Sequence, residues 1–67
     1  MFGKMKPEQF KAIRQGAGLT QSRLVAFLRI SDVRTIRRWE TGEIPVSGPA
    51  SYLMELLDEG VIHAQRN

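Results

Sequence analysis

The ten residues from Ser31 to Glu40 constrain the fold most strongly, because only a helix separates their apolar and charged side chains. At 3.6 residues per turn, Ile36 and Trp39 lie on one side of that helix. The opposite side carries three arginines at positions i, i+3 and i+4, namely Arg34, Arg37 and Arg38. We therefore predict an amphipathic helix over about residues 32–40 whose apolar side faces a core. Trp39 belongs to that core rather than to a ring-stacking site, because a single Trp supplies much of the apolar area of a small domain.

The arginine side of this helix has a charge pattern that folding alone does not favour. Like charges at neighbouring helical positions cost roughly 0.2–0.5 kcal/mol per pair. Arg34 also lies in the first turn, where the helix dipole disfavours a cation by about 0.3–1 kcal/mol. Glu40 follows Arg37 by three residues and can pair with it. A bound polyanion would reverse both unfavourable effects, and our hypothesis is that the polyanion is DNA.

Length and composition limit the alternatives. The chain has 67 residues, which is one small domain, and no cysteine for a disulfide or a thiolate metal site. Its 42% hydrophobic and 25% charged residues are ordinary for a soluble domain. No apolar run approaches the roughly 20 residues that span a bilayer, and the first six residues do not precede the apolar region of a signal peptide. We expect a cytoplasmic protein.

Charge is distributed unevenly along the chain. Residues 1–38 contain nine Lys/Arg and two Asp/Glu, a net charge of +7, whereas residues 39–67 contain one Arg and five Asp/Glu, a net charge of −4. This asymmetry predicts one surface that faces an anion and another that faces away from it. An ordinary solvated surface remains the alternative. Residues 1–6 are predicted to be a flexible arm whose lysines either contact phosphates or are simply solvated.

Two short helices are predicted before residue 32. Pro7 suits the first position of a helix that buries Phe10 and Ile13 and ends at two glycines, Gly16 and Gly18. Thr20 is the expected N-cap of the next helix. Leu24, Val25 and Leu28 form its inward stripe, with Phe27 beside them.

The start of the second helix is a candidate phosphate site. Gln21 can offer its amide beside free backbone N–H groups, and Arg23 adds a cation close by. The alternative is that both are plain surface residues. A short connection follows, in which Ile30 is an apolar plug and either Ser31 or Asp32 caps the next helix. Two short helices joined in this way have the layout of a helix-turn-helix.

A fourth helix completes the predicted domain, residues 7–59. Ile44 and Val46 in the preceding loop are expected to cover Trp39, and Ser47 is the expected N-cap. Its predicted core stripe is Ala50, Leu53, Met54 and Leu57. A second apolar set predicts a two-fold dimer interface; it comprises Tyr52, Leu56, Val61 and Ile62. The alternative is that the tail, residues 60–67, folds back onto the first helix.

These residues together resemble a known family. The segments Leu19-Thr20-Gln21 and Arg38-Trp39-Glu40-Thr41-Gly42, with the leucine pattern around them, are similar to the helix-turn-helix domain of lambda-repressor-like, Cro/C1-type (XRE) transcriptional regulators. The likeness covers about residues 7–57. The ending of the chain resembles that of short single-domain members, which include small phage repressors, anti-CRISPR-associated repressors and some antitoxins.

The resemblance implies an all-α bundle of four or five short helices that acts as a homodimer on a palindromic operator. It implies that Gln21 meets a phosphate and that Thr35 lies near the DNA backbone or a base. It also implies that base edges are read by Val33, Arg34 and Arg38. The chain departs from the family pattern at two places. Arg29 stands in the turn where glycine is usual, and Ser31 precedes Thr35 by four residues instead of three.

We therefore expect a repressor of double-stranded DNA promoters, often of its own operon. Arg34 and Arg38 are expected to read guanines in the major groove. The expected phosphate contacts are Thr20, Gln21, Ser22, Arg23 and Arg37. The alternative is an antitoxin that masks a toxin protein through the fourth helix and the tail. We expect no enzyme, cofactor or metal, because His63 is the only histidine and no nucleophile–base pair or glycine-rich phosphate loop is present.

Overall fold

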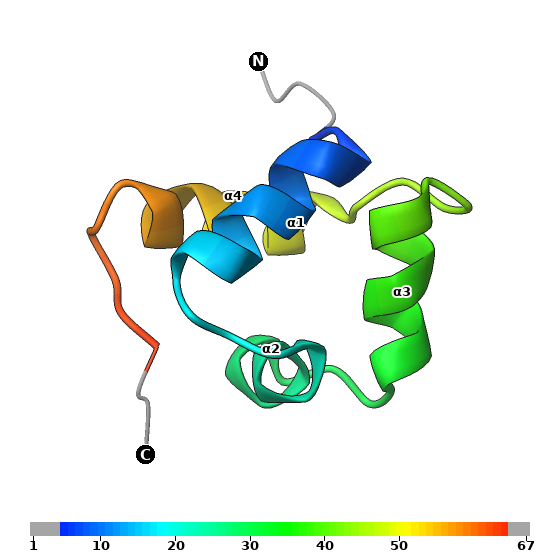
Figure 1. Ribbon diagram of the computed structural model, residues 1–67, viewed down its shortest axis with the longest axis horizontal. Coiled ribbons are helices and arrows are strands. Elements are labelled where there is room, and N and C mark those ends of the chain that lie inside the picture. The colour runs from blue at the N-terminus through cyan, green and yellow to red at the C-terminus, as the bar shows by residue number, and fades with distance from the viewer. Residues whose placement is uncertain (1–4, 65–67) are drawn as a thin grey trace.

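Four helices form where the capping residues of the sequence place them. The computed structural model describes residues 5–64, which contain α1 (Pro7–Gly16), α2 (Gln21–Leu28), α3 (Val33–Thr41) and α4 (Gly48–Asp58) (Figure 1). This part of the chain contains no strand. The predicted all-α class is thus confirmed with four helices, and residues 60–64 form no fifth helix.

Each helix start has a local cause. Pro7 opens α1, where a missing N–H costs no hydrogen bond. The hydroxyl of Thr20 accepts a hydrogen bond from the backbone N–H of Arg23 at 3.1 Å and so caps α2. Ser47 caps α4 in the same way, accepting from the N–H of Ala50 at 3.3 Å. These caps satisfy backbone donors that would otherwise lack a partner.

Left-handed backbone conformations follow the ends of the helices. Gly18, Gly42 and Gly60 have φ angles of 74°, 82° and 78° after α1, α3 and α4. After α2 the same role falls to Arg29, with φ 57° and ψ 42°. The backbone N–H groups of Arg29 and Ile30 donate to the carbonyls of Ala26 and Val25, a pattern that closes the helix end. Arg29 therefore adopts the conformation that favours glycine, and the turn forms without a glycine.

The core sits where the four helices meet. Its largest fully buried side chains come one from each helix, and they are Phe10, Leu24, Ile36 and Met54. α1 packs against both α3 and α4, and α2 packs against α3, within an envelope of 30 × 26 × 18 Å. Figure 1 shows α3, in green, along one side of the molecule with an outer face that no other helix covers.

Several details of the packing differ from the sequence prediction. Met5, placed in the flexible arm, is buried in the core, and residues 1–4 of that arm lie outside the described residues. On α2 only Leu24 is buried, and Val25 and Leu28 of the predicted stripe are half-buried. On α4 the buried positions are Ala50, Ser51 and Met54, whereas Leu53 and Leu57 are only half-buried. A small hydroxyl can face the packed side of a helix without a void, which the apolar pattern alone does not reveal.

The loop before α4 covers Trp39 only in part. Val46 is buried as predicted, but Ile44 remains exposed. Ile44 and Trp39 line an open groove together with Met5 and Pro7. No helix in residues 5–64 has the length and apolar character required to cross a membrane.

Candidate nucleic-acid interface

Asp32, rather than Ser31, caps the helix that carries the arginines. Its Oδ1 accepts a hydrogen bond from the backbone N–H of Arg34 at 2.9 Å, and its own backbone is extended. The predicted helix over about residues 32–40 is therefore observed one residue later, as Val33–Thr41, with Gly42 ending it. The cap is strong because an ionised carboxylate at a helix N-terminus also suits the helix dipole.

One side of α3 fixes it to the domain. Ile36 is fully buried and Trp39 nearly so, as the spacing predicted. The Trp39 ring meets the ring of Phe10 on α1 edge to face, with centroids 5.6 Å apart and planes at 69°. Such an aromatic pair contributes about 0.5–1.5 kcal/mol beyond the area that it buries. The buried side thus determines which residues of α3 face solvent.

The opposite side presents the arginines to solvent. The Arg34 and Arg38 side chains are 71% and 54% exposed, and Arg37 is exposed as well. Val33 and Thr35 are half-buried at the edge of this surface. The five residues predicted to contact bases or phosphates from α3 therefore lie together on one continuous side of the helix.

Two of the three arginines have acidic partners that the sequence analysis did not identify. Arg34 pairs with Asp32 at 2.8 Å, and Arg38 pairs with Glu43 at 3.1 Å. Both pairs are solvent-exposed, and exposed pairs contribute only about 0–1 kcal/mol. The repulsion between the arginines is thus partly compensated at small energetic gain.

The pair at the start of α3 changes the ionisation of both partners. Hydrogen bonds from the side chain and the backbone of Arg34 lower the pKa of Asp32 below its usual value. The carboxylate in turn raises the pKa of Arg34. Both groups are therefore charged throughout the neutral pH range.

The predicted pair between Glu40 and Arg37 does not form. Glu40 accepts instead from Arg14 of α1, with Nε to Oε2 at 2.7 Å and Nη2 to Oε1 at 3.3 Å. Arg14 also donates from Nη1 to the carbonyl of Leu19 at 2.8 Å. The side chains of Arg14 and Glu40 are only 11% and 6% exposed. This buried pair joins α1 to the end of α3.

The same carboxylate holds Gln21. The amide nitrogen of Gln21 donates to Oε1 of Glu40 at 3.1 Å, and the side chain is half-buried. Gln21 thus has a structural partner as well as its predicted phosphate contact, which stays a prediction. The bond brings the start of α2 next to the end of α3, so the two predicted DNA-contacting segments are neighbours.

Sequence reasoning did not single out Arg14. One signal was present, because Arg14 follows the buried Phe10 by four residues and so lies on the same side of α1. A charged residue on a buried stripe requires a partner, because an unpaired buried charge is expensive. The partner is 26 positions away, so the sequence alone does not identify it.

The remaining predicted phosphate contacts lie at the α2 N-terminus. Thr20, Ser22 and Arg23 are all exposed there. The Thr20 hydroxyl already accepts the capping hydrogen bond, while the first turn of α2 contains no acidic residue. The dipole of α2 is therefore not neutralised by a carboxylate in its first turn, a condition that suits an anion.

Comparison of the chain with protein-family models, with curated proteins and with solved structures finds no match. The resemblance to the Cro/C1-type regulators therefore stays a prediction that depends on the residues quoted for it. Functional inference for this chain depends on the geometry of α2 and α3.

The predicted dimer residues lie on α4 and in the segment that follows it. Tyr52 and Val61 are 54% and 64% exposed, whereas Leu56 and Ile62 are half-buried. A backbone hydrogen bond of 3.0 Å from the N–H of Val61 to the carbonyl of Leu56 fixes the turn after α4. Two of the four predicted residues are thus exposed, and a dimer interface at this place stays a prediction.

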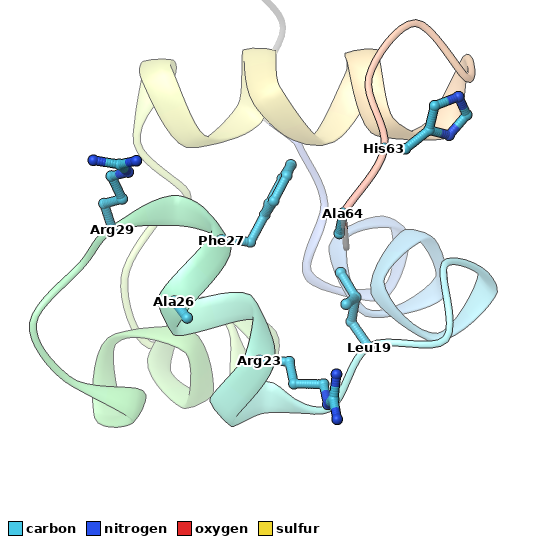
Figure 2. Close-up of a pocket in the computed structure, with 7 residues that line it drawn as sticks. All are labelled: Leu19, Arg23, Ala26, Phe27, Arg29, His63 and Ala64. Atoms are coloured by element: carbon cyan, nitrogen blue, oxygen red, sulfur yellow. The ribbon is translucent and has the colours of Figure 1, made fainter. Parts of the chain in front are cut away.

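The tail also shows the predicted alternative in part. Ala64 packs against the core, and His63 and Ala64 line a hollow together with Gly16 and Ala17 at the end of α1. His63 and Ala64 border an open hollow of about 520 Å³ whose other side includes Leu19 and Phe27 (Figure 2). Residues 65–67 of the predicted tail lie outside the described residues. Across residues 5–64, no group of three His, Asp or Glu side chains could hold a metal ion.

Proposed function

We propose that this protein is a sequence-specific, double-stranded DNA-binding transcriptional repressor that binds a palindromic operator as a homodimer. The observation that carries the proposal is the division of α3 into a buried side and an exposed side. Ile36 and Trp39 fix the helix, and Arg34, Arg37 and Arg38 point away from the domain. A cytoplasmic location, regulation of its own gene and the absence of a cofactor belong to the same proposal.

A helix of this shape suits the major groove of B-DNA. The groove is about 12 Å wide and admits one α-helix. Its guanines present two acceptors, O6 and N7, that match two donors of an arginine. We assign base reading to Arg34 and Arg38, with Val33 and Thr35 beside them, and phosphate contact to Arg37.

The ion pairs on α3 do not oppose this function strongly. An exposed pair contributes about 0–1 kcal/mol, whereas one bidentate contact between an arginine and the correct base contributes about 1–3 kcal/mol of discrimination. Arg34 and Arg38 can therefore exchange or share their acidic partners at small cost. Pairs this weak leave both arginines available for contact with DNA.

The start of α2 supplies the proposed backbone contacts. Its exposed residues Thr20, Ser22 and Arg23 lie beside Gln21, which is bonded to Glu40 at the end of α3. A contact between this turn and a phosphate would thus be rigidly connected to the helix in the groove. Phosphate contacts set the position of the protein on the duplex and make affinity depend on salt.

The exposed apolar residues after Ser51 support the homodimer part of the proposal. Tyr52, Leu56, Val61 and Ile62 offer a surface that a second copy can cover. A two-fold dimer would place two copies of α3 on half-sites about one helical turn apart. Occupation of such a site within a promoter would exclude polymerase, which is the proposed mechanism of repression.

The decisive experiment is selection of bound sequences from a random duplex library, with the oligomeric state measured on the same sample. We expect a palindromic consensus with guanines in each half-site and an affinity that falls steeply with salt. Equal affinity for the consensus and for scrambled duplexes in moderate salt would refute the proposal. A protein that binds no duplex but forms a stable complex with a toxin protein would identify the antitoxin alternative.

A further inference from the structure

Asp32 makes two separate contacts with the residue two positions later. Its Oδ1 caps the helix by accepting from the backbone N–H of Arg34 at 2.9 Å. Its Oδ2 accepts from Nε and Nη2 of the Arg34 side chain at 3.0 and 2.8 Å. One carboxylate therefore both starts α3 and fixes the orientation of the guanidinium at its first turn.

The contact leaves a particular edge of Arg34 available. A guanidinium has five N–H donors in a planar fork, and Asp32 takes the edge formed by Nε and Nη2. The end formed by Nη1 and Nη2 is directed away from that carboxylate, on a side chain that is 71% exposed. Two donors at this end match the O6 and N7 acceptors of a guanine.

We propose that Asp32 is a positioning residue that holds Arg34 ready to read a guanine and, by its own charge, weakens binding to other sequences. This inference depends on the DNA-binding function proposed above. An arginine normally loses rotamer freedom when it binds, and the ion pair removes part of that freedom in advance. The carboxylate also repels phosphates wherever Arg34 finds no guanine to compensate.

Arg38 provides the contrast within the same helix. It pairs with Glu43, with Nε and Oε2 3.1 Å apart, and the Glu43 side chain is 63% exposed in the loop after α3. An ion pair with this exposed loop residue restrains the guanidinium less than the two contacts that Asp32, which is 37% exposed, makes from the helix cap. Glu43→Gln is therefore a matched control, because it removes one negative charge near α3 without touching Arg34.

The test begins with the base pair that Arg34 reads, defined as the position where Arg34→Ala loses discrimination in the duplex selection. Affinity is then measured for the selected site and for the same site with that guanine replaced by adenine. Asp32→Ser keeps a good N-cap but removes the carboxylate, and Asp32→Asn does so at nearly constant size. We expect either change to reduce discrimination at this position by about 5-fold or more and to increase affinity for scrambled DNA.

A double-mutant cycle separates positioning from a general effect on folding. In the Arg34→Ala background, Asp32→Ser is expected to leave the ratio of affinities for the selected site and for scrambled DNA unchanged, because its effect on discrimination acts through Arg34. Glu43→Gln is expected to raise affinity for all duplexes while keeping that discrimination. Thermal unfolding of each variant verifies that α3 remains folded.

Three results would overturn the inference. In the first, Asp32→Ser and Asp32→Asn both discriminate as well as the unmodified protein. In the second, Asp32→Ser lowers discrimination by the same factor with and without Arg34. In the third, Arg34→Ala loses discrimination at no base pair. Each leaves the proposed function intact as long as the unmodified protein selects its site. Failure of the unmodified protein to select any sequence would refute the proposed function itself, and this inference with it.

Discussion

Arg14 and Glu40 form a buried ion pair that joins the last turn of α1 to the end of α3, with Nε and Oε2 2.7 Å apart. The same two residues bind the carbonyl of Leu19 and the amide of Gln21. Every buried side-chain nitrogen and oxygen in the described part of the chain has a partner. The pair therefore sets the position of α3 and of the α2 start relative to α1.

Breaking this pair from one side is expected to be costly. Glu40→Ala leaves the Arg14 guanidinium buried without a carboxylate, which lowers the free energy of unfolding by about 3 kcal/mol. Urea denaturation followed by the fluorescence of Trp39 measures the change. Glu43→Ala is the matched control, because Glu43 pairs only at the surface, and it is expected to cost less than about 1 kcal/mol.

Replacing both partners tests the reason for that cost. The double variant Arg14→Met, Glu40→Leu removes the charges together, and we expect it to recover most of the stability that Glu40→Ala loses. A double variant as unstable as Glu40→Ala would show that the hydrogen bonds to Leu19 and Gln21, rather than the unpaired charge, dominate.

The sequence predicted those features whose causes are local. Thr20 and Ser47 were identified as caps, and Ile36 and Trp39 as buried, because each depends on residues within a few positions. The choice between Ser31 and Asp32 stayed open, since both are good caps and the difference lies in backbone conformation. Local rules thus place the helices to within about a residue and identify the exposed side of α3.

The features that the sequence did not predict depend on contacts between distant segments. The partner of Glu40 is 26 residues away on α1, whereas Arg37 is the nearer candidate by helical spacing alone. The burial of Met5 likewise follows from packing that no local pattern shows. The partners of Arg34 and Arg38 are short-range, but they depend on rotamers that spacing does not fix.

Arg29 is expected to cost stability in its present conformation. A residue with a Cβ at φ 57° is disfavoured by roughly 1–2 kcal/mol, and glycine removes this strain. Glycine also increases the conformational entropy of the unfolded chain, which lowers stability by about 0.5–1 kcal/mol. Arg29→Gly should therefore raise the free energy of unfolding by up to about 1 kcal/mol. Arg29→Ala removes the same charge but keeps the strain, and it should give no such gain. Equal stabilisation by both variants would point to the charge instead.

The pairing of Asp32 predicts a dependence of stability on pH. Because its pKa is lowered in the folded protein, the folded state favours the ionised form. This stabilisation is complete above the unfolded value of about 4 and is lost as pH falls through the lower folded value. Urea midpoints measured from neutral pH down to strong acid should decline more steeply for the unmodified protein than for Asp32→Asn. Parallel curves would contradict a contribution from this carboxylate.

Two arginines are expected to affect DNA binding in different ways. Arg38→Ala should reduce the discrimination at one base pair by about 1–3 kcal/mol. Its effect on the affinity for scrambled duplexes should be smaller than its effect on the affinity for the selected site. Arg23→Ala should weaken binding to all duplexes alike and reduce the salt slope by about one. Fluorescence anisotropy with the selected site and a scrambled duplex, at several salt concentrations, distinguishes the two effects. Equal losses on both duplexes for both variants would exclude this division of roles.

The exposed apolar surface around Val61 is expected to hold two copies together. A charge introduced there by Val61→Asp would lie in the interface without a partner, and we expect dimer affinity to fall at least tenfold, or about 1.4 kcal/mol. Ile44→Asp is the control, because Ile44 is an exposed apolar residue in the groove beside Trp39 rather than on this surface. Sedimentation equilibrium measures the association of each variant. If Val61→Asp associates as strongly as Ile44→Asp, the dimer uses another surface, and binding to the palindrome should then be equally strong for both variants.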